Sequence, residues 1–173
     1  MTLKEYQVQC QRTLVDKGIE MNKAHMIMGV LGEINELMDA LREQDLVNIH
    51  EEYADEMWYI SNLATLYNVD ISERKIVFLD ELDIVTKLYY LSKLSDLVKR
   101  DVIYNKPPDQ AQITEIIHIV VEFNIKMFEK KSWDFNRALE NNINKLKVRF
   151  PEKFTEELAN NRNLEAERKE LEN

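Results

Sequence analysis

Two short acidic pairs lie close together in the first third of the chain. Glu33 is followed three residues later by Glu36, and Glu52 is followed three residues later by Asp55. Residues three apart on a helix lie on the same face, so each pair can converge on one point. Both pairs are interleaved with apolar residues, and two helices packed antiparallel through these apolar stripes would bring the four carboxylates together.

Such a group of carboxylates needs a positive partner. Four negative charges held together away from water would be strongly destabilising without one. Oxygen ligands suit a hard cation, which favours Mg²⁺ or Mn²⁺, and bound Mg²⁺ commonly bridges to substrate phosphates. The pattern therefore indicates a receptor for a nucleoside triphosphate. A solvated acidic face is the alternative, because Glu43, Glu51 and Glu56 make the segment acidic all round.

Amino-acid composition indicates the fold class of the chain and the kinds of partner it can bind. Only 3 Gly and 3 Pro occur in 173 residues, which favours long helices over a β-rich fold with many turns. We therefore expect one all-α domain over residues 1–173, built as a helical bundle. The formal net charge of −9 argues against broad nucleic-acid binding. The single cysteine, Cys10, and the absence of a long apolar run lead us to expect a soluble cytoplasmic protein with no membrane partner.

Helical periodicity predicts the two elements that position the acidic pairs. The first spans residues 22–42, and the second spans residues 47–67. The apolar face of the first is expected to consist of Met28, Leu31, Ile34, Leu37, Met38 and Leu41. A capping-box pattern at Asp70 and Glu73 predicts that a third long helix begins there.

Later segments continue the helical pattern. Two prolines interrupt it near residue 107, and Asp109 is expected to cap the next helix. Another helix is expected over residues 133–150. Residues 152–173 form a charged, helix-prone tail with little apolar face.

The chain also shows a weak internal repeat. Residues 31–41 can be laid over 91–101, and residues 51–64 over 114–127. This overlay places Glu33 on Lys93, Glu36 on Asp96, Glu52 on Glu115 and Asp55 on His118. The chain is then a tandem of an active half, residues 20–70, and a degenerate half, residues 80–150. A chance match is the alternative, because any two amphipathic helices share an apolar pattern.

The acidic segment resembles a known family. The pattern GExxEL followed by EExxDExWYxxxLA is similar to the all-α nucleotide pyrophosphohydrolases, the MazG-like group related to dimeric dUTPases. Further stretches resemble the same group: LKEYQVQCQRT, HMIMGVLGEINEL, NNINKLKVRFPEKF and NRNLEAERKELE. Two features depart from it. The glycine of the family's EELGD pattern is missing, and the loop-like KRDVIYNKPPD lies in the second half, which favours the tandem interpretation.

The resemblance implies the reaction and a set of site residues. Nucleoside triphosphates or deoxynucleoside triphosphates would be converted to monophosphate and pyrophosphate. Mg²⁺, with Mn²⁺ as an alternative, would be held by Glu33, Glu36, Glu52 and Asp55, and Glu36 is our candidate to orient or deprotonate the attacking water. Candidates for binding the substrate are Trp58 and Asn62 for the base, and Asn142, Lys145 and Arg149 for the phosphates. Packing is the alternative role for Trp58, and a solvated face is the alternative for Lys145 and Arg149.

Several alternatives remain open from the sequence. A di-iron carboxylate bundle would use a Glu-x-x-His pattern, which occurs once, at Glu115 and His118. A non-enzymatic helical protein that binds a partner is the other rival. Within the enzymatic interpretation, the substrate is open between non-standard nucleotides, as in nucleotide-pool house-cleaning, dUTP and dCTP. Whether two chains pair as a homodimer is open too.

Overall fold

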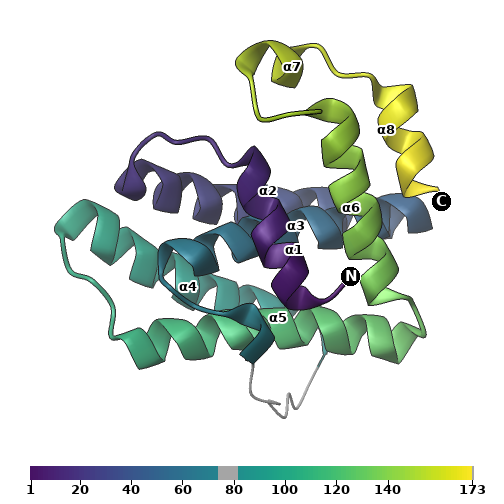
Figure 1. Cartoon of the computed structure of the whole chain (residues 1–173). Helices are drawn as coiled ribbons and strands as arrows, with labels where there is room; N and C mark the ends of the chain where they lie inside the picture. Colours follow the sequence, from purple (N-terminus) through teal and green to yellow (C-terminus); the bar gives the residue numbers. More distant parts are fainter. Residues whose placement is uncertain (74–81, 173) are drawn as a thin grey trace.

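The acidic segment forms a helical hairpin. In the computed structural model, which describes residues 1–73 and 82–172, α2 spans Ile19–Glu43 and α3 spans Leu46–Leu66. Gln44 adopts the left-handed conformation (φ 59°), and the Asp45 side chain caps α3 by accepting hydrogen bonds from the backbone N–H groups of Val47 and Asn48. The chain therefore reverses within two residues, and α2 and α3 lie side by side (Figure 1).

A second hairpin packs against the first. It consists of α4, Ile84–Tyr104, and α5, Gln110–Lys131. Asn105 takes the left-handed conformation at the end of α4, and Asp109 caps α5 as predicted. Contacts join α2 to α4 and α3 to α5, so the two hairpins form the body of the bundle (Figure 1).

Shorter helices surround this body. The chain begins with α1, Leu3–Cys10, whose N-terminus has the capping box of Thr2 and Glu5. After α5 the elements are α6, Phe135–Arg149, then α7, Glu156–Asn160, and α8, Leu164–Leu171. Both α1 and α6 pack on α3, and α8 lies beside α6 (Figure 1).

The described residues confirm the all-α fold. Their regular structure is entirely helical, with short 3₁₀ turns at Gln11–Thr13 and Ile71–Glu73. No helix among them is long and apolar enough to cross a membrane. The core is formed by fully buried apolar side chains from several helices, among them Leu37, Met57, Ile60, Leu63, Leu91, Leu94, Ile117 and Val121.

Two details of the sequence prediction were wrong. On α2, Ile34 and Leu37 are buried as expected, but Met28, Leu31 and Leu41 are exposed. Met26, Ile27 and Val30 are buried, so the core-facing stripe begins one to two residues earlier. Where a long helix was expected from Asp70 onward, Ile71–Glu73 form a 3₁₀ turn, and α4 begins at Ile84, capped by Asp83. Residues 74–81 of that expected helix lie outside the described residues.

Candidate metal centre and substrate cavity

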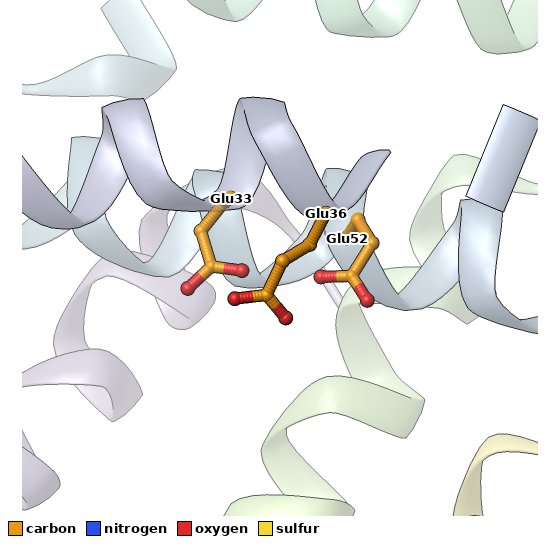
Figure 2. Close-up of side chains that lie close together, drawn as sticks. All are labelled: Glu33, Glu36 and Glu52. Atoms are coloured by element: carbon orange, nitrogen blue, oxygen red, sulfur yellow. The ribbon is translucent and has the colours of Figure 1, made fainter. Parts of the chain in front are cut away.

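Three carboxylates converge between α2 and α3 (Figure 2). Glu33 and Glu36 come from α2 and Glu52 comes from α3, and one oxygen of each lies within 4.8 Å of an oxygen of the other two. Glu36 is exposed to solvent, Glu33 is partly buried, and Glu52 is only 9 % exposed. Throughout residues 1–73 and 82–172, no other three acidic, histidine or cysteine side chains meet this closely.

Local packing explains why these side chains meet. Ile34 and Leu37 on α2 are buried, and so are Tyr53 and Met57 on α3. These residues fix the rotation of each helix, and the three-residue spacing then places the acidic side chains on the neighbouring face. The convergence of Glu33, Glu36 and Glu52 therefore follows from how the hairpin packs, whereas Asp55, the fourth acid predicted to join them, lies outside this close group.

The carboxylates oppose one another's ionisation. Burial, the charge of Asp55 and a hydrogen bond with Glu52 together raise the pKa of Glu33 to about 9. Burial and the charge of Asp55 raise the pKa of Glu52 to about 7. A divalent cation would relieve this repulsion, and the all-oxygen donor set suits a hard one.

Asp55 lies beside this cluster and is held from a different helix. One of its carboxylate oxygens accepts a hydrogen bond from the side-chain amide of Asn142, and the other pairs with the ammonium group of Lys145, both at 2.5 Å. A carboxylate offers about four lone-pair sites, so these bonds leave Asp55 able to bind a cation as well. Hydrogen bonds of this kind commonly orient metal-binding carboxylates.

Two residues predicted to bind substrate, Lys145 and Asn142, are therefore already bonded to other side chains inside the protein. Lys145 is 1 % exposed and also pairs with Glu51 at 3.0 Å. Asn142 is fully buried, and the hydroxyl group of Tyr6 lies 2.9 Å from its side-chain oxygen. The geometry thus gives Lys145 and Asn142 contacts that position Asp55.

A cavity of about 190 Å³ adjoins the acidic cluster. Glu33 and Asp55 line it on the acidic side, and Trp58 and Tyr59 contribute aromatic rings. The remaining lining residues are Thr13, Val15, His25, Leu146, Arg149, Phe150, Phe154 and Ala159. The cavity thus combines carboxylates, aromatic surface and one guanidinium group.

The two residues predicted to bind the base differ in their placement. Trp58 lines the cavity, and its indole N–H donates to the hydroxyl group of Thr13 at 3.1 Å. Asn62 is fully buried, and its amide donates to the Trp58 carbonyl oxygen within α3. Asn62 is not among the residues that line the cavity.

Sequence reasoning missed the close contact that shapes this cavity. The ring of Tyr59 packs directly on Gly29, where an added Cβ would lie 2.1 Å from a ring carbon. Burial raises the pKa of Tyr59 to about 12, with a further contribution from the charge of Glu33. A glycine in the middle of a predicted helix was the available signal, because such a residue is unfavourable unless close packing requires it.

The second hairpin brings together the positions that the repeat overlay matched to the acidic cluster. Lys93, Asp96 and Glu115 all line a hollow of about 410 Å³ between α4 and α5. A ring nitrogen of His118 lies 3.0 Å from the backbone oxygen of Asp70, and among the described residues His118 belongs to no group of three close acidic, histidine or cysteine side chains. Among the described residues, Glu115 and His118 therefore do not form the carboxylate–histidine group that a di-iron site needs.

Fold and site together define an all-α protein with a carboxylate cluster suited to a divalent cation, beside a cavity lined by aromatic rings and one guanidinium group. Residues 21–77 match the family model of the MazG nucleotide pyrophosphohydrolase domain, which confirms the resemblance inferred from the acidic motif. The matched segment includes all of α3 and most of α2. No curated protein matches the chain, and no solved structure does.

Proposed function

We propose that this protein is a Mg²⁺-dependent nucleoside triphosphate pyrophosphohydrolase. It adds water across the bond between the α- and β-phosphates, giving a nucleoside monophosphate and pyrophosphate. The observation that supports this most is the meeting of Glu33, Glu36 and Glu52, inside the family-matched segment, beside a cavity that contains Arg149.

The acidic cluster would hold the cation. Glu33, Glu36 and Glu52 offer oxygens that are already close together, and Asp55 adds a fourth carboxylate at the wall of the same cavity as Glu33. A bound Mg²⁺ or Mn²⁺ ion would neutralise triphosphate charge and would stabilise the charge that develops on the pyrophosphate leaving group.

The protein's own groups complete the reaction. Glu36 is the most exposed carboxylate of the cluster, so water reaches it first, and we assign it to orient this water and accept its proton. The water oxygen bonds to the α-phosphorus, and the bond to the bridging oxygen of the β-phosphate breaks. Arg149 binds phosphate oxygens from the cavity wall, and Trp58 stacks on the base.

The test is release of pyrophosphate from a panel of nucleotides. Nucleoside and deoxynucleoside triphosphates, including dUTP and dCTP, are compared with Mg²⁺ and with a chelator. We expect metal-dependent release by the wild type, and its near-complete loss in Glu36→Gln. Glu43→Gln is the matched control, because Glu43 is an exposed acid at the end of the same helix and should leave the rate unchanged. Absence of release from every nucleotide by a folded protein would refute the proposal.

The preferred nucleotide would then define the biological role. Preference for dUTP or dCTP would indicate control of the standard nucleotide pool, and preference for a modified base would indicate removal of damaged nucleotides. Base choice depends on a few contacts in the cavity, where one hydrogen bond to a base can change the relative rate greatly.

A further inference from the structure

A buried carboxylate from α8 joins two arginines beside the cavity. Glu167 is 2 % exposed and accepts two hydrogen bonds from Arg149, one from Nε at 3.1 Å and one from Nη2. It also accepts from Nε and Nη2 of Arg162, at 3.4 and 2.7 Å. Such bidentate pairs fix the plane of each guanidinium group.

Arg149 is a cavity-lining residue, and Arg162, which does not line the cavity itself, is joined to it through Glu167. Arg149 lines the cavity together with Glu33 and Asp55. Hydrogen bonds that Arg162 donates to Glu167 raise the pKa of Arg162, and the charges of Glu51 and Asp55 add to this effect. The intervening segment also reaches the cavity, because Phe154 and Ala159 contribute to its lining.

Each guanidinium group keeps donors that Glu167 does not use. Arg149 and Arg162 both bind Glu167 through Nε and Nη2, and within the described residues neither Nη1 group has a hydrogen-bond partner. The Arg162 side chain is 41 % exposed and that of Arg149 is 18 % exposed, so both remain accessible. Two guanidinium groups around one carboxylate also leave one net positive charge, which favours an anionic ligand.

We propose that Arg149 and Arg162, oriented by Glu167, form a subsite for the phosphate groups of the nucleoside triphosphate. This inference rests on the proposed function, and it adds Arg162 as a substrate-binding residue and Glu167 as a positioning residue. Lys145 cannot take this place without leaving Asp55 and Glu51, since it is buried and paired with both. Through Glu167, the C-terminal helix α8 thereby positions two substrate-binding residues.

Substitution of Arg162 gives the main test. Arg162→Ala should raise the KM for the preferred nucleotide about tenfold or more, the usual scale for a lost charge-assisted hydrogen bond, and should change kcat by less than about threefold. Arg162→Lys keeps the charge but lacks the planar fork, so its KM should lie between those of the wild type and Arg162→Ala.

Arg168 provides the matched control on the same C-terminal segment. It also docks α8 on the body of the protein, through Asn48 and Asp45, but the Glu167 side chain is bound by Arg149 and Arg162 rather than by Arg168. Arg168→Ala should therefore leave KM unchanged. Equal KM values for Arg162→Ala and the wild type would overturn the subsite, as would equal increases in the Arg162→Ala and Arg168→Ala variants.

Glu167→Gln tests the orienting role. A neutral amide holds two guanidinium groups less firmly, so KM should rise while kcat changes little. A lower KM in this variant would show that Glu167 competes with substrate phosphates, and would overturn the positioning role. Thermal unfolding of each variant establishes that it is folded.

Binding of inorganic tripolyphosphate to the metal-free protein separates this inference from the proposed function. Calorimetry at low salt should show binding that Arg162→Ala weakens and Arg168→Ala does not. If no nucleotide is hydrolysed but this pattern holds, the function fails and the anion subsite stands. If the wild type hydrolyses nucleotides and Arg162→Ala changes neither KM nor tripolyphosphate binding, the subsite fails alone.

Discussion

The ammonium nitrogen of Lys145 on α6 lies 2.5 Å from a carboxylate oxygen of Asp55 on α3. Lys145 is almost completely buried, whereas the Asp55 side chain is 23 % exposed toward the cavity. Burial of the cation lowers its pKa, and the charges of Asp55 and Glu51 outweigh that effect, so the pKa of Lys145 is raised. The buried Lys145 therefore holds Asp55, which lines the cavity, from the side of the protein interior.

Lys145→Met should weaken both the fold and the site. Removing one partner of a buried ion pair leaves the other charge uncompensated, and since Asp55 and Glu51 keep some exposure we expect a loss of about 3 kcal/mol in the free energy of unfolding. Loss of the group that orients Asp55 should lower kcat/KM about 10- to 100-fold. Urea denaturation and pyrophosphate release measure these effects. Lys147→Met, at an exposed position on the same helix, is the control, and equal behaviour of the two variants would contradict this role.

Substitution by alanine should change stability in opposite directions at two glycines of α2, Gly29 and Gly32. Gly29→Ala places a Cβ 2.1 Å from the ring of Tyr59, so α2 must move from α3 or the ring must leave the cavity. We expect a loss of about 1–3 kcal/mol in the free energy of unfolding, together with a higher KM. Gly32→Ala meets no atom within 4 Å and should stabilise the helix by about 0.5–1 kcal/mol. Chemical denaturation of both variants decides, and a neutral Gly29→Ala would show that the contact is not tight.

Local spacing was enough to predict that Glu33, Glu36 and Glu52 lie close together, but not that Asp55 lies outside their group. Glu33 and Glu36 depend only on the three-residue period of a helix, and the hairpin that brings Glu52 to them follows from a short connection at Asp45. The same periodicity misplaced part of the apolar face of α2. Two overlapping stripes fit the sequence, and only packing against α3 and α4 selects the one that contains Met26 and Val30.

Contacts between distant segments could not be predicted in the same way. Lys145 and Arg149 differ only by four positions on α6, but one is paired with Asp55 and the other with Glu167. Which of them faces the cavity depends on where α8 docks, and the charged sequence of α8 contains few apolar residues to indicate this. The sequence therefore identified the cations near the site but not their individual partners.

The metal-free protein should lose stability as the pH rises. The pKa of Glu33 in the folded protein, about 9, is above its ordinary value of 4.5, so its contribution to stability is present below pH 4.5 and is lost as the pH rises through about 9. Glu52, with a pKa of about 7, acts in the same direction. Mg²⁺ binds the ionised carboxylates, and should therefore raise the melting temperature more at pH 8.5 than at pH 5.5.

Glu33→Gln isolates this effect, because glutamine does not ionise. Without metal, the stability of the wild type relative to this variant should fall between pH 5.5 and pH 8.5, as measured by urea denaturation at each pH. Glu43→Gln, at the exposed end of α2, should show no such relative change. A constant difference between the wild type and Glu33→Gln across this range would mean that the carboxylates do not oppose one another's ionisation.

A second buried ion pair joins the two hairpins. Glu56 on α3 pairs with Lys87 on α4, and the two side chains are 0 % and 1 % exposed. The ammonium group of Lys87 also lies 4.3 Å from the centre of the Tyr53 ring. Neither charged residue lines the cavity or belongs to the acidic cluster, so the pair contributes to the joining of the hairpins.

Removing one partner of this ion pair should destabilise the protein far more than replacing both partners with apolar residues. Lys87→Met leaves a fully buried carboxylate without its counter-charge, and should reduce the free energy of unfolding by about 3–5 kcal/mol. Replacing both residues, with Glu56→Leu and Lys87→Met together, removes the desolvation penalty of both ions and should recover most of that loss. Chemical denaturation of the single and double variants measures the difference, and pyrophosphate release by the double variant should remain close to that of the wild type. A double variant as unstable as Lys87→Met would show that hydrophobic packing cannot replace this pair between the hairpins.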